Sequence, residues 1–332
     1  MSEYGYTGAV PTQNTAKNSG VFQVNDIIDL QADNGWSLSE YPVQYLVIAG
    51  GGSGGCGFSL AAGAGGGAGG YRNSYASEDS GANSSTETPM TITPNTDFLI
   101  TVGAGGAATT NHSPGNAGND SVLGAVTSVG GGRGSSATNG GPTSGGSGGG
   151  GTGYHGRASG TTDQGSIGGH GLHGPNTCPN HYQAGGGGGG ASAAGTRCSC
   201  SGGAIPGGNG LNSSITGTSV GRGGGGSGSN NDTTSNQANG NNGYGGGNAR
   251  AGTGSGNSYS GVANTGGGGG GGQANTSANS GAGGSGTVIV RVPLDWNCNN
   301  ASGLTFTETL DYVLHQKIIQ FTAGTDTVQF GA

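Results

Sequence analysis

Short apolar runs separated by glycine-rich stretches indicate where strands lie in this chain. The first run is Val43 to Ala49 (VQYLVIA), which is short, mostly apolar and ends at a glycine tract, as a buried strand does. Four further strand-like runs are Met90–Thr93, Phe98–Val102, Ser121–Val129 with a central Gly124 typical of a bulge, and Thr287–Val292. Because the last of these follows a long glycine-rich tract, we expect the tract to be inserted in one β framework that this strand completes.

The two ends of the chain have a different pattern. Near the start, Asn25 is expected to cap a short helix that ends at Asn34-Gly35. Near the end, LTFTETL and KIIQF alternate apolar and polar residues and predict a small β module. The predicted organisation is an N-terminal attachment segment (1–40), a β framework (41–130, completed by 286–293), a glycine-rich tract (131–285) and a C-terminal β module (294–332).

Glycine dominates the composition, with 85 of 332 residues against a usual share of about 7%. Each helical glycine costs about 1 kcal/mol relative to alanine, so a helical protein is excluded. Glycine does not recur at every third position, which excludes collagen. No apolar run reaches the roughly 18 residues of a membrane-spanning helix, so membrane insertion is not expected.

Charge is sparse and slightly acidic, with a formal net charge of −7 and lysine only at Lys17 and Lys317. No basic face is expected, so binding of nucleic acid is not expected either. The opening MSEYGYTGAV lacks the basic and apolar regions of a secretory signal, which predicts synthesis in the cytoplasm. The low hydrophobicity of the glycine-rich tract (131–285) is typical of disorder. Disordered chains usually carry many charges, however, and this tract carries few.

Polyglycine offers an ordered alternative, the left-handed helix with three residues per turn (polyglycine II). Its backbone N–H and C=O groups point outward, and without Cβ atoms neighbouring helices can approach until these groups pair. The predicted fold is therefore mostly β plus irregular, with little α-helix and a bundle of polyglycine II helices. The all-glycine runs Gly185–Gly190 and Gly266–Gly272 are expected at its centre.

The spacers between glycine runs carry the candidate binding residues. Loops rich in Tyr, His, Asn and Ser on a rigid scaffold are typical of binding surfaces, although such residues also simply cap the ends of helices. Both interpretations remain open. The candidates are Tyr154, His155, Arg157, His170, His173, His181, Tyr182, Tyr244 and Tyr259.

The order of motifs resembles a known family. The motifs are YLVIAGGGSGG (45–55), GAGGGAGGY (63–71), ITVGAGG (100–106), SVGGGRG (128–134) and, after the glycine-rich tract, SGTVIVRV (285–292). Together they resemble the glycine-rich domain of phage tail-fibre and adhesin proteins over residues 43–293. The resemblance implies a small β-sandwich framework carrying polyglycine helices, whose distal loops bind host surface receptors. The segment at 18–36 is similar to an attachment module that precedes such domains.

Two motifs compete with this interpretation. Gly50 to Gly55 satisfies the dinucleotide fingerprint G-x-G-x-x-G after a strand, but the sequence that follows is a poor helix, so no nucleotide cofactor is expected. His170, His173, Cys178, His181, Cys198 and Cys200 are weak metal-ligand candidates. Paired C-x₂-C spacing is absent, and ordinary loop residues or a disulfide from Cys178 to Cys198 or Cys200 are the alternatives.

Catalysis is not expected. No serine lies in a strand-to-helix elbow, and glycosidase chemistry needs two carboxylates in one groove, whereas the tract offers only Asp163 and Asp232. The expected function is that of a virion tail-fibre or adhesin protein that binds a saccharide or outer-membrane protein on the host bacterium. Other virion proteins are expected to bind the N- and C-terminal segments, and a homo-oligomer is compatible with this. The alternative is a structural or decorating virion protein that binds only other virion proteins.

Overall fold

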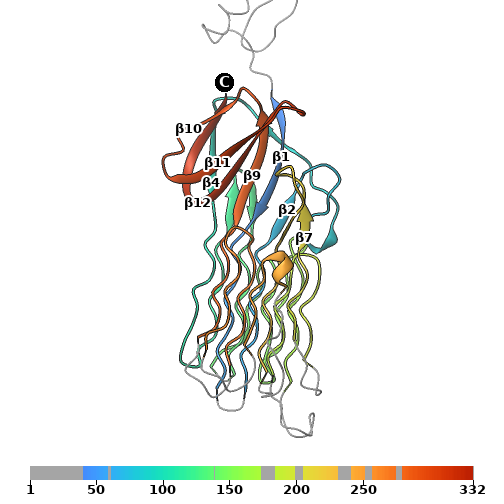
Figure 1. The fold of residues 1–332 in the computed structure, drawn as a ribbon, viewed down its shortest axis with the longest axis vertical. Coiled ribbons are helices and arrows are strands. Elements are labelled where there is room, and N and C mark those ends of the chain that lie inside the picture. Colours follow the sequence, from blue (N-terminus) through green and yellow to red (C-terminus); the bar gives the residue numbers. More distant parts are fainter. Residues whose placement is uncertain are drawn as a thin grey trace, which may run out of the picture.

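The computed structural model is elongated, with strands at one end and glycine-rich segments extending from them (Figure 1). It describes residues 40–58, 61–137, 139–172, 184–198, 205–230, 241–250, 256–273 and 279–331. The predicted helix after Asn25 and all but the last residue of the predicted attachment segment lie outside the described residues.

Regular secondary structure is almost entirely β. The strands are β1 (Tyr41–Ile48), β2 (Tyr71–Asn73), β3 (Met90–Ile92), β4 (Asp97–Thr101), β5 (Ser121–Leu123), β6 (Val126–Ser128), β7 (Leu211–Ser213), β8 (Val220–Arg222), β9 (Thr287–Pro293), β10 (Asn297–Asn299), β11 (Leu304–Asp311) and β12 (Gln316–Gly331). The described residues add only two short 3-10 turns, η1 (Gly81–Asn83) and η2 (Asn242–Tyr244). The prediction of a mostly β protein with little α-helix is confirmed.

The apolar runs at 43–49, 90–93, 98–102 and 287–292 form β1, β3, β4 and β9, as predicted. The run at 121–129 was predicted to form one bulged strand, and the structure differs. It forms two strands, β5 and β6, paired as an antiparallel hairpin with Leu123 opposite Val126. Gly124 lies in the turn with a φ of +54°, a conformation that tight hairpin turns require and that glycine adopts without a Cβ clash.

Ten strands form one sheet with the order β2-β1-β9-β12-β4-β5-β6, while β3 pairs with β1, and β10 and β11 pair with β12. The sheet curls until β1 approaches β5 and β6. The framework is therefore a nearly closed, barrel-like sheet. A separate two-stranded sheet, β7-β8, lies beside it.

The last strand, β12, occupies the middle of this sheet. Its first half pairs with β9 over residues 316–321, and its second half pairs with β4 over residues 325–329. The strand changes partners around Gly324, which has a φ of +100°. The sequence assigned residues 294–332 to a module of their own, whereas the structure places β12 between two framework strands.

Alternating apolar residues fill the interior of the curled sheet. The buried cluster there includes Val43, Tyr45, Val47, Ile100, Val288, Val290, Val292, Ile319, Phe321, Val328 and Phe330. Burial of each large apolar side chain contributes about 1.5–3 kcal/mol. This framework supplies the aliphatic core that the glycine-rich segments lack.

The outer face of β1 and β9 is also buried. Leu46, Ile48 and Ile289 pack there with Tyr71 and with Ile215 of the β7–β8 turn. This explains why β1 and β9 are nearly continuous apolar runs, because each has side chains buried on both faces.

Backbone hydrogen bonds hold the glycine-rich segments together. Gly50, Ser53 and Cys56 donate to the carbonyl oxygens of Asn119, Asn116 and Ser113, so every third residue contacts the same neighbour. The intervening residues follow the same rule with other neighbours: Gly51 and Gly54 donate to residues 284 and 281, and Gly52 and Gly55 donate to residues 67 and 64. Each segment is thus bonded to several others that lie side by side with it (Figure 1).

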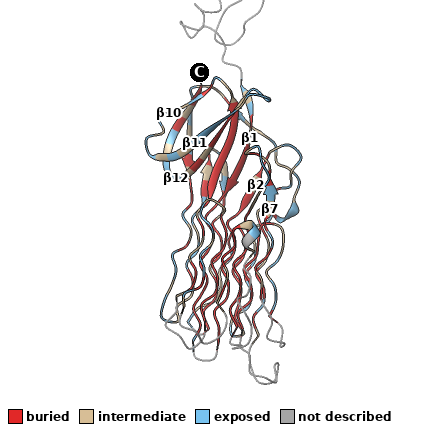
Figure 2. Ribbon diagram, in the orientation of Figure 1, coloured by how far each residue is buried: buried red, intermediate tan, exposed pale blue. Residues whose placement is uncertain are grey.

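The inner segments are buried although they carry few side chains, whereas outer residues such as those at 104–120 are mostly exposed or half-buried (Figure 2). The runs 185–190 and 266–272, expected to be central, are buried throughout. The mixed runs at 145–153 and 221–228, for which the sequence predicts a place further out in the bundle, are buried as well, apart from the half-buried Gly153 and Gly221. A Cβ added to Gly51 would lie 2.2 Å from the carbonyl oxygen of Gly267, well inside contact distance. Packed main chain therefore forms this part of the interior.

Candidate binding surface

The glycine-rich segments reverse direction in turns at the end of the molecule opposite the sheet (Figure 1). We call this the distal end, and its described turns lie at 56–58, 109–113, 139–141 and 153–157. Hydrogen bonds link neighbouring turns. The Cys56 Sγ donates to the Thr109 carbonyl oxygen at 3.0 Å, and the Thr109 backbone N–H donates to Ser280 Oγ at 3.0 Å. The distal end is therefore a connected surface.

Three of the predicted binding residues share one distal turn. The side chains of Tyr154 and Arg157 are exposed there, Tyr154 by 50%. His155 is half-buried, and its Nε2 is buried with no hydrogen-bond partner among the described residues. The turn is anchored by Thr152, whose hydroxyl donates to the Ser136 carbonyl oxygen at 3.1 Å. Tyr154 also lines a small depression together with Leu172.

His170 and Cys198 lie on adjacent distal segments. The Cys198 backbone N–H donates to the His170 carbonyl oxygen at 3.0 Å. The His170 ring is exposed, and the Cys198 side chain is buried beside Leu172 and Ile205. Burial raises the pKa of the Cys198 thiol to about 11, which keeps it protonated at neutral pH. Within the described residues, no three His, Cys, Asp or Glu side chains gather as metal ligands.

The two remaining described candidates lie apart from that turn. Tyr259 is exposed by 46%, and the Arg250 guanidinium lies over its ring at 5.7 Å from the centroid. Tyr244 belongs to η2, which lies next to the β7–β8 sheet and away from the distal end (Figure 1). The other predicted site residues, His173, Cys178, His181, Tyr182 and Cys200, lie outside the described residues.

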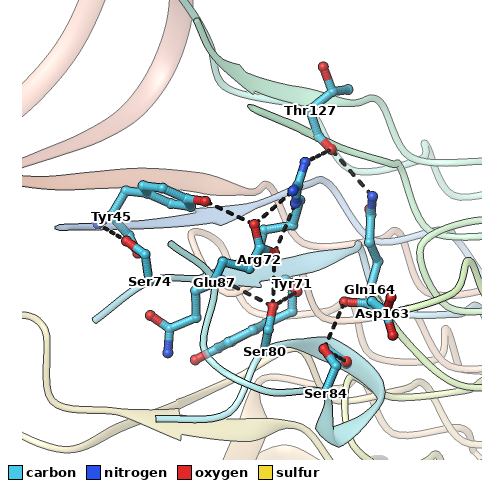
Figure 3. Close-up of polar contacts among 12 residues, drawn as sticks. Tyr45, Tyr71, Arg72, Ser74, Ser80, Ser84, Glu87, Thr127, Asp163 and Gln164 are labelled. Atoms are coloured by element: carbon cyan, nitrogen blue, oxygen red, sulfur yellow. Dashed lines mark hydrogen bonds and ion pairs between the residues drawn. The ribbon is translucent and has the colours of Figure 1, made fainter. Parts of the chain in front are cut away.

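A second feature lies on the side of the molecule, where the glycine-rich segments meet the framework. Glu87 accepts hydrogen bonds there from the Tyr45 hydroxyl at 2.8 Å and from Ser80 Oγ at 3.1 Å. Arg72 pairs with Glu87 through two bonds, of 2.9 Å from Nε and 2.7 Å from Nη2 (Figure 3). Burial and the bond to Glu87 raise the pKa of Tyr45, and the same carboxylate raises the pKa of Arg72.

This Arg72–Glu87 pair forms part of a groove of about 820 Å³. Its other wall is the turn that carries Asp163 and Gln164. The Gln164 amide fixes that wall to the framework, because its Oε1 accepts from the Val129 backbone N–H at 2.8 Å. We call this feature the lateral groove.

A family model described as a glycine-rich domain matches residues 35–293. This span covers most of the chain, including the framework strands up to β9 and all the glycine-rich segments. The chain belongs to this glycine-rich domain family. None of the curated proteins compared with it matches.

In this glycine-rich domain, the fingerprint-like run Gly50–Gly55 is part of the interior. Its backbone N–H groups donate to carbonyl oxygens of other segments, so they are already used within the fold. Among the described residues, no helix is both long and apolar enough to cross a membrane.

Two features of the glycine-rich domain were not predicted from the sequence. One is an aromatic pair at the distal end, where Phe58 packs edge-on against His112 with centroids 4.6 Å apart. Phe58 is 44% exposed, and an apolar aromatic residue directly after a glycine run was the available signal. The other is the lateral groove, whose walls come from separate parts of the chain and leave no local motif.

Proposed function

We propose that the glycine-rich segments are polyglycine II helices carried by a β-sandwich. The three-residue period of the hydrogen bonds supports this, because a helix with three residues per turn presents every third N–H to the same neighbour. The partner exchange of β12 at Gly324 supports the sandwich, since a strand that changes ladders connects two layers.

We propose further that the protein is a phage virion component, a tail-fibre or fibre-tip adhesin that binds the surface of a host bacterium. The observation that carries this proposal is the difference between the two ends of the elongated molecule. The start of β1 and the described C-terminal end lie at the framework end, opposite the distal turns (Figure 1). One end is thus suited to attachment to other virion proteins and the other to recognition.

The chemistry of the distal turns suits a receptor surface. Tyr154 and Phe58 supply exposed aromatic rings, and rigid aromatic residues dominate binding energy in many interfaces. A host saccharide and an outer-membrane protein both offer partners for such groups, and several copies on one particle would strengthen attachment.

Adsorption inhibition tests this proposal. We expect the purified protein to block adsorption of particles that carry it, and Tyr154→Ala to block roughly tenfold less well, the effect of losing one important aromatic contact of about 1.4 kcal/mol. Tyr312→Ala is the matched control, because Tyr312 is 68% exposed at the framework end. Equal blocking by Tyr154→Ala and the wild-type protein would reject the distal turns as the receptor site.

A structural virion protein remains the second candidate function. Leu310, Tyr312, Val313 and Leu314 are exposed together in and beside the β11–β12 turn. Contiguous exposed apolar residues mark protein contacts, and these would dock onto other virion proteins. Under this alternative the purified protein blocks no adsorption, and Tyr312→Ala reduces its incorporation into particles.

A further inference from the structure

The lateral groove is a polar feature lined by the loop at 84–88 and the turn at 162–164, together with Tyr45 of β1 and Arg72 of β2. Its volume of about 820 Å³ falls within the range of about 300–1,000 Å³ that is usual for small-molecule sites. Five serine and threonine side chains line its two walls: Ser84, Ser85, Thr86, Thr88 and Thr162. Such a lining offers hydrogen-bond donors and acceptors over its whole length.

The walls of the groove are fixed by hydrogen bonds within the loop between β2 and β3 and by a bond to β2. The Ser84 hydroxyl donates to the Gly81 carbonyl oxygen at 2.8 Å, and Thr86 Oγ1 donates to the Glu78 carbonyl oxygen at 2.5 Å. On the opposite wall, the backbone carbonyl of Gln164 accepts from the Tyr71 N–H at 3.0 Å. A preformed groove of this kind avoids much of the entropy cost of ordering loops on binding.

The charges around the groove limit what it can bind. Arg72 and Glu87 neutralise each other in a two-bond pair (Figure 3). The exposed carboxylate of Asp163 makes no side-chain hydrogen bond to any described residue, so it leaves the groove with a net negative charge. Anionic ligands such as phosphates or acidic polysaccharides are therefore disfavoured.

We propose that the lateral groove binds a neutral, hydroxyl-rich saccharide, with Asp163 and the wall hydroxyls as hydrogen-bond partners. The ring of Tyr45, the only aromatic residue in the described lining, is 2% exposed. A ligand that needs an aromatic stacking platform, such as a nucleobase, is thus a poorer fit than a polyol. This site is separate from the distal turns, and the inference goes beyond the proposed function because it requires no virion.

Binding of the whole protein to an array of immobilised glycans tests the inference. The array should display neutral hexose and N-acetylhexosamine oligosaccharides beside sialylated and phosphorylated ones. We expect binding to neutral members, reduced at least about tenfold by Thr162→Trp or Ser85→Trp, because an indole would occupy part of the groove that the ligand needs. Both positions are exposed, so the variants are expected to melt like the wild-type protein.

Thr218→Trp is the matched control, because Thr218 is exposed in the β7–β8 turn and does not line the groove. It should bind glycans like the wild-type protein. Binding to charged glycans alone, equal loss in Thr218→Trp and Thr162→Trp, or no binding to neutral glycans would overturn the inference. Adsorption inhibition by Tyr154→Ala is a separate measurement. A failure of the glycan-binding inference can therefore be distinguished from a failure of the proposed function.

Discussion

At the scale of single residues, the missing Cβ of glycine sets how closely two backbones approach. Around Gly269, a Cβ would lie 2.1 Å from the Gly281 carbonyl oxygen and 2.5 Å from that of Ala282. Both contacts are with backbone, which cannot rotate away as a side chain can. The Gly269 N–H donates to the Gly52 carbonyl oxygen at 2.9 Å, so the same residue also belongs to the backbone hydrogen-bond network.

Alanine at Gly269 should therefore be strongly destabilising. We expect Gly269→Ala to lower the free energy of unfolding by about 3 kcal/mol or more, at or above the upper end of ordinary overpacking costs. Gly156→Ala is the matched control, because its Cβ would meet nothing within 4 Å, and it should be neutral or stabilising by up to about 1 kcal/mol. Denaturant unfolding of both variants measures the difference, and similar stabilities would contradict close backbone packing.

At the scale of elements, the β11–β12 hairpin is fixed by its turn. The Asp311 carboxylate accepts from the backbone N–H groups of Leu314 at 3.1 Å and Val313 at 3.2 Å. It also pairs with the buried Arg291 of β9, whose Nη1 donates to the Ile215 carbonyl oxygen at 2.8 Å. One carboxylate thus links the hairpin to β9 and, through Arg291, to the β7–β8 turn.

These contacts predict a pH dependence of stability. The Leu314 N–H, assisted by Arg291, lowers the pKa of Asp311. A lowered native pKa adds stability above the unfolded value of about 3.9, and that stability is lost as the pH falls through the native pKa. Asp311→Asn should therefore show a shallower loss of unfolding free energy on acidification than the wild-type protein. Asp295→Asn, at an exposed residue beside β9, should keep the wild-type slope.

Sequence patterns identified elements only where enough apolar residues lie together. β1 and β9 were predictable because both of their faces are buried, which produces long apolar runs. β2 and β7 have three residues each and are partly polar, so neither leaves a recognisable period. The place of β12 was not predictable, because its pairing with β4 joins residues more than two hundred positions apart.

At the scale of the whole molecule, the path of the chain decides which candidate binding residues reach the distal end. Tyr154, His155 and Arg157 are neighbours in sequence, and one turn carries all three to the distal end. Tyr244 looks equivalent in sequence, but it lies in η2 beside β8, where Gly224 donates to its carbonyl oxygen at 2.9 Å. Composition identifies a spacer between two glycine runs. It does not reveal whether the spacer lies at the distal end of the molecule or at the framework end.

Hydrogen exchange tests whether the glycine-rich segments behave as one packed interior. Their N–H groups bond to neighbouring segments throughout the runs 185–189 and 268–272, so exchange requires separation of several segments at once. We expect these amides to exchange at least about a thousandfold more slowly than in an unprotected peptide, since a global stability of about 5 kcal/mol permits this. The exposed turn at 153–157 provides the internal comparison and should label quickly. Complete labelling of the glycine runs as fast as that turn would mean that their hydrogen bonds do not persist in solution, and the interior would then be restricted to the β framework.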